Sequence, residues 1–412
     1  MKNAKGILCL LVVLLYVLFA GILPKVCFLG DMDYWYRWIG IIREVGLGNV
    51  YEHRVNYQPF FLYCLYLFDA FQGTEENLNK FLHYIKLIPL LFDFLGALLV
   101  FLVCKIDWKN LYFPFLLLFN VAYLYNSLLW GQVDSIHTFF VVLALLLALR
   151  KYPILALLAY VLAINMKLQS IIFLPIIGLL LVEHVKKPRL VLQSLLAAAA
   201  LQLLLLLPFL RAGTLDDFYT MTTSAAEWHP YISMNAFNFW YYVVDSEPAM
   251  TRDSITFLDI SYKHWGLSMF LALGFFTLLP MMYTALQQFH HKTISFGEKF
   301  RLSFLTAGLV CVLFFWVNTQ MHERYAHPAI LLFFFYGMRS KDFSFYFIVS
   351  LAYLLNMEKV LKAFNFNNYH TLIFAEEFIA SLYLLVLLRG WYVLYYRYFK
   401  PNWEDFSLKL IK

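Results

Sequence analysis

The sequence predicts an all-α protein that crosses a membrane about 12 times. Two properties of the 412-residue chain support this prediction: 62% of its residues are hydrophobic, and only 14% are charged. A soluble domain carries about a quarter charged residues, so this chain has too little polar surface to remain in water. The mean hydropathy of +0.67 agrees with this conclusion. Composition therefore excludes a soluble enzyme, a disordered chain and a small secreted domain held together by disulfides.

Charge and cysteine content narrow the class further. Lys and Arg number 32 against 26 Asp and Glu, which leaves a net charge of +6. This charge is too small and too scattered for a nucleic-acid binder, so we expect no nucleic-acid partner. The five cysteines are widely spaced and form no CxxC pair, so they predict neither a disulfide framework nor a metal cluster.

Apolar segments of the length that a spanning helix needs recur along the whole of 1–412, which we expect to form a single transmembrane domain. Such a helix takes roughly 20 mostly apolar residues. The expected spans, in chain order, are 6–23, 85–103, 111–126, 134–149, 153–166, 168–184, 190–210, 265–286, 302–317, 326–338, 343–357 and 373–394. Several are short, so the expected number is about 12, within a range of about 11 to 13. The first span, 6–23, is expected to be a membrane anchor rather than a cleaved signal peptide, because no small-residue cleavage site follows it.

Basic residues alternate between the two sides of these spans. If the N-terminus is cytoplasmic, 19 of the 32 Lys and Arg fall in cytoplasmic stretches and 13 fall outside. Short loops rich in Lys and Arg remain on the cytoplasmic side. We therefore expect an integral multi-pass membrane protein with both termini in the cytoplasm.

Two long external segments result from this topology, 24–84 and 211–264. Within the first, Tyr34–Gly46 is expected to form an amphipathic helix at the membrane surface. Its apolar stripe consists of Trp35, Trp38, Ile39 and Ile42. Phe60–Phe71 is expected to form a second interfacial or re-entrant piece.

Four polar clusters lie at the external ends of the predicted spans, and the first is Gly30–Asp33. One of its two carboxylates, Asp31 or Asp33, can take a proton from an attacking hydroxyl while the other orients it or meets a cation. The alternative is a solvated loop that stops the first span from sliding. The pair can also ligate Mg²⁺ or Mn²⁺, but two carboxylates alone make a poor site. We expect no metal and no other cofactor.

The second and third clusters flank the predicted spans at 134–149 and 153–166. Asp134, which ends the run Trp130–Asp134, either caps a helix or has a functional role, and capping does not explain Gln132 or His137. In the third cluster, Asn165–Gln169, Lys167 either extends to lipid headgroups or holds a phosphate.

The fourth cluster, Asn318–Pro328, places two histidines, a Glu and an Arg between two apolar spans. Arg324 can grip a phosphate with two hydrogen bonds, and His322 can donate to a phosphate or relay a proton. The alternative is an ion pair between Glu323 and Arg324 that ties two helix ends together. No Walker loop, GxGxxG, HExxH or GxSxG accompanies these clusters. The chain therefore shows no domain that binds a sugar nucleotide from the cytoplasm. An enzyme that acts externally must then receive its activated donor in the membrane.

These motifs resemble those of the GT-C superfamily, multi-spanning glycosyltransferases that use polyprenyl-phosphate sugars. Gly30-Asp31 with Trp38 resembles the first-loop signature of the dolichyl-phosphate-dependent glucosyl- and mannosyltransferases. Tyr57-Gln58-Pro59 resembles the YPP turn of that superfamily, with Gln in place of the first Pro.

Three further motifs together resemble those of bacterial relatives of the second mannosyltransferase of GPI-anchor assembly. They are Trp130–Asp134 (WGQVD), Lys167-x-Gln169 and His322–Tyr325. The resemblance covers about residues 25–330, and the motifs occur in the same order.

The resemblance implies an inverting transfer of a hexose, with mannose favoured, from a polyprenyl-phosphate sugar at the extracytoplasmic face. The acceptor is a glycan, a lipid or a protein. Asp31 is the implied general base, with Asp33 or Asp134 as supporting carboxylates. The donor phosphate is assigned to Lys167, His322 and Arg324. Substrate contacts are assigned to Trp38, Tyr57, Gln132, Gln169, Glu323 and Tyr325.

Two other classes fit the same topology: a flippase or transporter for lipid-linked saccharides, and a polymerase that joins lipid-linked repeat units. The charged groups cluster externally rather than at mid-membrane depth, which argues against a carrier.

No Asn-x-Ser/Thr sequon occurs in the chain. Because lumenal loops often carry one, its absence favours a bacterial inner membrane over the endoplasmic reticulum.

Overall fold

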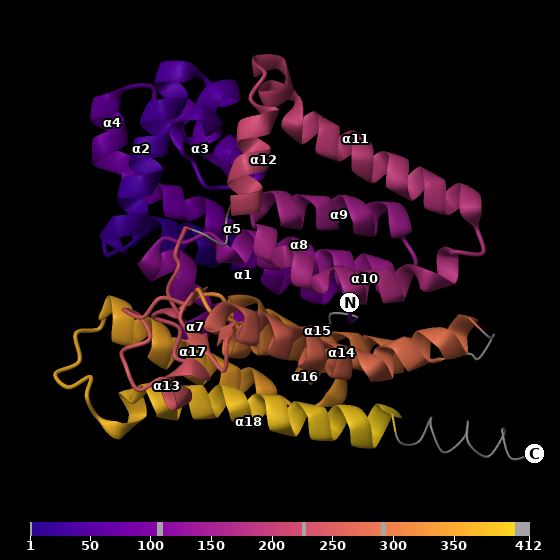
Figure 1. Ribbon diagram of the computed structural model, residues 1–412. Helices are drawn as coiled ribbons and strands as arrows, with labels where there is room; N and C mark the ends of the chain where they lie inside the picture. The colour runs from indigo at the N-terminus through magenta and orange to yellow at the C-terminus, as the bar shows by residue number, and fades with distance from the viewer. Residues whose placement is uncertain (1, 105–109, 225–227, 290–293, 400–412) are drawn as a thin grey trace, which may run out of the picture. The chain divides into compact units, whose positions relative to one another are not determined.

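The fold is that of a computed structural model, which describes residues 2–104, 110–224, 228–289 and 294–399. Within these ranges the chain is mainly helical (Figure 1). The described residues also include four strands of two residues each, which form two separate pairs. The prediction of an all-α polytopic membrane protein is confirmed.

The chain divides into two compact units. Unit 1 comprises the described residues of 1–147, 152–171 and 189–228, and unit 2 comprises those of 148–151, 172–188 and 229–412. The elements that lie wholly or mainly in unit 1 are α1 (Lys2–Gly21), α2 (Leu29–Val45), η1 (Leu47–His53), α3 (Pro59–Gln72), α4 (Glu75–Phe81), η2 (Leu82–Lys86), α5 (Leu87–Leu98), η3 (Leu99–Leu102), α6 (Tyr112–Leu118), α7 (Val121–Leu124), η4 (Tyr125–Trp130), α8 (Asp134–Leu149), α9 (Pro153–Met166), η5 (Leu168–Phe173), α11 (Pro188–Ala212) and α12 (Leu215–Thr223).

Unit 2 contains the C-terminal helices and all four strands. Its elements are α10 (Leu174–Leu181), η6 (Val182–His184), β1 (Ser233–Met234), α13 (Trp240–Val243), β2 (Thr256–Phe257), β3 (Ile260–Ser261), α14 (Tyr262–Phe289), α15 (Phe296–Val317), β4 (Met321–His322), α16 (His327–Ser340), α17 (Ser344–Leu361), η8 (Leu372–Phe374), α18 (Glu376–Leu394) and η9 (Tyr395–Phe399).

The predicted spans all fall on helices. Across the described ranges, seven helices are long and apolar enough to cross a membrane, and an eighth crossing results if one bent pair counts as a single span. The remaining predicted spans fall on three shorter apolar helices and on α16. The span expected at 85–103 begins earlier, because one helical stretch runs from Glu75 to Leu102.

The bend between the two helices of this pair has a local cause in the sequence. The helices Tyr112–Leu118 and Val121–Trp130 meet at an angle of 58°. Between them, the Asn120 side chain accepts hydrogen bonds from the backbone N–H groups of Ala122 and Tyr123, which caps a new helix. The predicted span at 111–126 is therefore broken at Asn120.

Helix α2 is the amphipathic helix expected in the first external segment. Its buried residues are Met32, Trp35, Trp38, Ile39 and Ile42, which include the whole predicted stripe. The helix packs against α3 within unit 1, where the rings of Trp35 and Phe61 lie 4.6 Å apart. The second predicted piece, Phe60–Phe71, corresponds to α3.

A buried lysine fixes the segment that leads into α2. The ammonium group of Lys86 donates to the backbone carbonyls of Pro24 at 2.8 Å, Leu128 at 3.1 Å and Val26. Lys86 is fully buried, so these carbonyl dipoles replace the water that a charged group requires. The lysine thereby ties the start of α2 to the end of η4.

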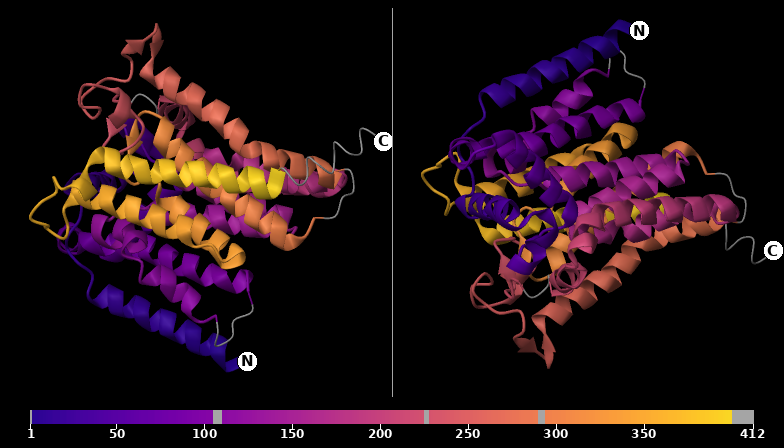
Figure 2. Two further views of the ribbon diagram at one scale, coloured as in Figure 1. Left: turned by 90° about the horizontal axis from the view of Figure 1, so that it is seen from below. Right: turned by 90° about the horizontal axis from the view of Figure 1, so that it is seen from above.

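Helices α14 to α18 form the core of unit 2. Helix α15 runs alongside α14 and α18 (Figure 2), and α15 and α16 are almost completely buried. Strand β1 pairs with β4 in parallel, with Ser233 opposite Met321 and Met234 opposite His322. This pairing joins the segment after residue 228 to the turn between α15 and α16.

Gly266 of α14 permits a close approach to that turn. A methyl group at this position would lie 2.8 Å from the carbonyl oxygen of Val317 and 3.2 Å from the Cα of Asn318. We expect Gly266→Ala to lower the free energy of unfolding by about 1–3 kcal/mol, because the contacts are with backbone that cannot rotate away. Thermal unfolding in detergent measures this loss.

Gly274, two turns further along α14, supplies the matched control. Nothing lies within 4 Å of a methyl group placed there. Gly274→Ala should leave stability unchanged or raise it, since Ala favours a helix over Gly by about 1 kcal/mol. An equal effect of the two substitutions would contradict the role given to Gly266.

Candidate functional site

Asp31 lies in the first turn of α2 and is held by a tryptophan from the second sequence motif. Its carboxylate accepts a hydrogen bond of 2.7 Å from the indole Nε1 of Trp130. The indole is itself fixed, because its ring stacks on Phe28 at 4.9 Å and its backbone carbonyl accepts from the N–H of Phe28 at 3.0 Å. Asp31 is half-buried, so unit 1 presents a partly desolvated and oriented carboxylate.

Asp33 occupies a different environment from Asp31. Its side chain is 71% exposed and lies 4.0 Å from the guanidinium of Arg37, one turn further along α2. Residues two positions apart on a helix point to nearly opposite sides, so the two carboxylates diverge. Among the residues that the structure describes, no group of three or more His, Cys, Asp or Glu side chains is arranged to hold a metal ion.

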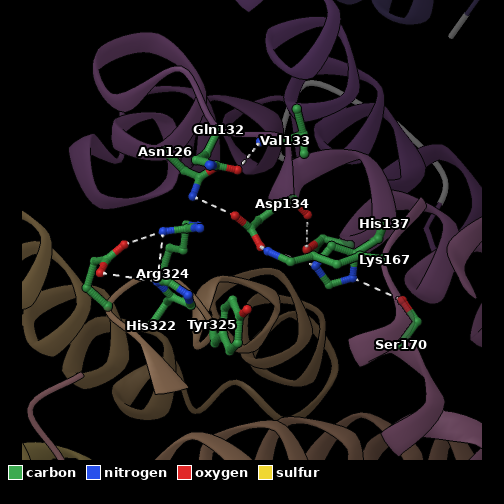
Figure 3. A network of polar contacts seen from close by, with 12 residues as sticks. Asn126, Gln132, Val133, Asp134, His137, Lys167, Ser170, His322, Arg324 and Tyr325 are labelled. Atoms are coloured by element: carbon green, nitrogen blue, oxygen red, sulfur yellow. Dashed lines mark hydrogen bonds and ion pairs between the residues drawn. The ribbon is translucent and has the colours of Figure 1, made fainter. Parts of the chain in front are cut away.

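Asp134 is the first residue of α8 and is fully buried (Figure 3). One carboxylate oxygen forms an ion pair with the ammonium of Lys167, and the other accepts a hydrogen bond of 3.1 Å from Asn126 Nδ2. His137 Nε2 lies 3.6 Å from the first oxygen, and its Nδ1 lies 3.1 Å from the hydroxyl of Ser170. Asp134 is thus the centre of a buried polar network in unit 1.

Lys167 lies between α9 and η5, and its side chain is only 11% exposed. The sequence alternatives for this residue, a lipid headgroup contact or a phosphate contact, did not include Asp134. A buried ion pair of this kind is strongly destabilised when one member is removed. Lys167 therefore has a structural partner whatever else it binds.

Three predicted substrate-binding residues also meet within unit 1. The hydroxyl of Tyr57 donates to Gln132 Oε1 at 3.3 Å, and the rings of Tyr57 and Trp38 lie 5.5 Å apart. Gln132 is fully buried. Gln169 is half-buried in η5. The first-loop motif and the WGQVD motif thus come together through Tyr57.

The fourth cluster lies in unit 2, on β4 and the turn that follows it (Figure 3). Arg324 Nη1 donates to Glu323 Oε1 at 2.6 Å and lies 3.4 Å from His322 Nδ1. Glu323 is 2% exposed, so the predicted Glu–Arg ion pair is present and buried. The Arg324 guanidinium also lies over the ring of Tyr325, 5.9 Å from its centre.

Two polar residues that the sequence did not single out lie beside this cluster in unit 2. The ring of His229 lies 5.2 Å from that of His322, edge to face. Asp253, which is 2% exposed, accepts hydrogen bonds from Thr319 Oγ1 at 3.1 Å and Gln320 Nε2 at 2.7 Å. No local pattern links these residues to the fourth cluster, since both are far from it in the sequence.

The C-terminal helices support the same region of unit 2. Asn356 of α17 is fully buried, donates to the carbonyl of Asn235 at 2.8 Å and accepts from the N–H of Phe237 at 3.0 Å. Both partners directly follow β1. The C-terminal part of the chain therefore positions the loop that carries β1.

Comparison with protein families gives a match over part of the chain. The model of the family described as ALG3 protein, dolichyl-phosphate-mannose-dependent mannosyltransferases of the GT-C type, matches residues 64–239. This range includes Gln132, Asp134, Lys167 and Gln169, whereas Asp31 lies before it. No curated protein matches the chain at a significant level. The family match and the apolar helices support a multi-pass membrane glycosyltransferase of the GT-C type that uses a lipid-linked sugar.

Proposed function

We propose that this chain is an inverting mannosyltransferase that takes mannose from a polyprenyl-phosphate sugar and transfers it to a glycan, lipid or protein acceptor. The observation that carries this proposal is the hydrogen bond from Trp130 to Asp31, which orients a half-buried carboxylate at the start of α2. The family match supports the donor class, because ALG3 proteins are mannosyltransferases that use dolichyl-phosphate mannose.

Asp31 acts as the general base in the proposed reaction. As an acceptor hydroxyl attacks the anomeric carbon, its proton passes to the carboxylate of Asp31. The bond between the anomeric carbon and the phosphate oxygen breaks, and the polyprenyl phosphate leaves with the electron pair. Such proton transfer contributes on the order of 10²–10⁴ in rate.

The charge of the departing phosphate needs positive partners. We assign this role to Lys167, His322 and Arg324, and phosphate stabilisation of this kind is worth on the order of 10²–10³ in rate. Asp134 supports the reaction indirectly by holding Lys167, and Asp33 adds a second carboxylate on α2. Substrate contacts are assigned to Trp38, Tyr57, Gln132, Gln169, Glu323 and Tyr325. No step in this scheme uses a metal ion.

The proposed location is a bacterial inner membrane, with both termini in the cytoplasm. The excess of basic residues in the alternate short loops supports this orientation. In this topology the first external segment, 24–84, carries Asp31 to the extracytoplasmic face. The donor and acceptor then meet the enzyme on that side.

One assay tests the proposed function. The purified protein in detergent is incubated with radiolabelled polyprenyl-phosphate mannose, or the glucose analogue, and candidate acceptors, with EDTA present. Transfer to an acceptor is expected, with mannose preferred. A flippase would give no bond formation in the absence of a sealed membrane, and a polymerase would give products longer than one added sugar. Loss of activity in EDTA would show that a divalent cation takes part.

Arg324→Ala is expected to weaken donor binding about tenfold or more, because a hydrogen bond to a charged group is lost. The measurement is the donor KM, together with the Tm of the variant in detergent. Arg324→Lys keeps the charge but loses the forked geometry, so it should recover only part of the affinity. An unchanged donor affinity with a lower Tm would mean that the ion pair with Glu323 is purely structural.

A further inference from the structure

A second imidazole lies next to that of His322 in unit 2. The rings of His229 and His322 lie 5.2 Å apart with an angle of 87° between their planes. Both side chains are partly accessible: His229 is half-buried, and the side chain of His322 is 14% exposed. The two residues therefore offer neighbouring imidazole groups to a ligand that reaches either one.

The backbone holds these two histidines in place. Gln320 N–H donates to the carbonyls of Tyr231 and Ile232, each at 3.1 Å, directly before the β1–β4 pairing begins. The N–H of Tyr231 in turn donates to the carbonyl of His229 at 2.7 Å. His229 thus sits on a segment that is hydrogen-bonded to the chain just before His322.

Buried side chains stabilise the segment that carries His229. Asp253 accepts from Thr319 and Gln320, and its own N–H donates to the carbonyl of Pro230 at 3.1 Å. Pro230 directly follows His229. Asn356 fixes the chain after β1 in the same way. A pair of histidines held this rigidly is preorganised for binding, since little conformational freedom remains to be lost.

The local charges indicate what the pair binds. The positive charge of Arg324 is already balanced by the buried carboxylate of Glu323, 2.6 Å away. A phosphodiester gains negative charge when it becomes a phosphate monoester, so its binding site must supply further hydrogen-bond donors as the reaction proceeds. The imidazole N–H groups of His229 and His322 are such donors. His322 is also next to Arg324, since its Nδ1 lies 3.4 Å from Arg324 Nη1.

We propose that His229 is a phosphate-binding residue that pairs with His322, and that the ligand of this pair is the phosphate group of a polyprenyl-phosphate sugar. This inference rests on the proposed function and deepens it, because it adds a residue that neither the sequence motifs nor the family match assigns. The departing polyprenyl phosphate accepts a hydrogen bond from each imidazole while Arg324 provides the third contact.

The test separates phosphate binding from ring packing. His229→Phe keeps an aromatic ring against His322 but has no N–H, whereas His229→Asn keeps a donor of similar reach. The probe is a short-chain polyprenyl phosphate, whose Kd is measured by titration calorimetry with purified protein in detergent. We expect about tenfold weaker binding for His229→Phe, since one charge-assisted hydrogen bond is lost, and a partial recovery in His229→Asn.

His264→Phe is the matched control. His264 belongs to the same external segment but is exposed and contacts Ser261 at 2.7 Å. The control should bind the probe as the wild type does, and the Tm of each variant shows whether it has folded. Wild-type affinity in His229→Phe, or an equal loss in both Phe variants, would overturn the inference.

Failure of the inference is distinguishable from failure of the proposed function. If the wild-type protein neither binds the polyprenyl phosphate nor transfers sugar, the proposed function is wrong, and the inference fails with it. If the wild type binds and transfers but His229→Phe does both equally well, only the role of His229 is wrong. His229→Phe with weaker binding and a wild-type Tm supports both.

Discussion

Asp31→Asn is expected to lower the rate of sugar transfer on the order of 10²–10⁴-fold, the contribution of a general base. The amide oxygen of Asn can still accept the hydrogen bond from Trp130 Nε1, so the start of α2 should keep its structure. An amide cannot take the proton of an acceptor hydroxyl at neutral pH. The expected result is therefore a loss of kcat with little change in Tm or donor affinity.

Two carboxylates in the same unit serve as comparisons for this variant. Asp33→Asn should have a smaller effect, because Asp33 is exposed and lies on a different side of α2 from Asp31. Glu76→Gln, in the exposed first turn of α4, should leave transfer unchanged. Wild-type turnover in Asp31→Asn would remove Asp31 from the role of base, and a loss confined to Asp33→Asn would transfer that role to Asp33.

Lys167→Met is expected to lower the free energy of unfolding by about 3–5 kcal/mol, the cost of breaking a buried ion pair. The substitution removes the cation that faces Asp134, whose side chain is fully buried. Asp134→Asn combined with Lys167→Met should recover much of this stability, because an amide is less costly to bury than a carboxylate. Chemical unfolding in detergent measures the three variants.

Lys151 provides the matched control for this prediction. It also pairs with a carboxylate, Glu183 at 3.1 Å, but its side chain is 63% exposed. Lys151→Met should cost no more than about 1 kcal/mol, as is usual for exposed ion pairs. If Lys167→Met were as stable as Lys151→Met but bound the donor more weakly, the main role of Lys167 would be phosphate binding.

Much of the fold can be read from the sequence because the signals are local. The apolar stretches predict the membrane-spanning helices, and the spacing of Trp35, Trp38, Ile39 and Ile42 predicts the buried face of α2. Helix bounds were harder to predict. Asn120 caps a new helix and breaks the predicted span at 111–126. The helix predicted at 85–103 begins already at Glu75, because it includes polar residues that hydropathy does not assign to a membrane span.

The polar clusters are also visible in the sequence, since charged side chains beside apolar spans are costly and therefore conspicuous. What the sequence leaves open is which partner each side chain meets. Capping was one alternative for Asp134 and a phosphate contact one for Lys167, and their mutual ion pair followed from neither. Hydropathy reports which residues leave water, but it carries no information on pairing between distant segments.

The sequence by itself determined a multi-pass helical membrane protein and most of the polar residues that deserve testing. Only the tertiary structure decided that Trp130 holds Asp31, that Asp134 holds Lys167, and that His229 lies against His322. The physical reason is the separation along the chain over which each signal acts. Helical periodicity and local charge act over a few residues, whereas Trp130 and Asp31 are 99 positions apart and meet only because helices of unit 1 pack together.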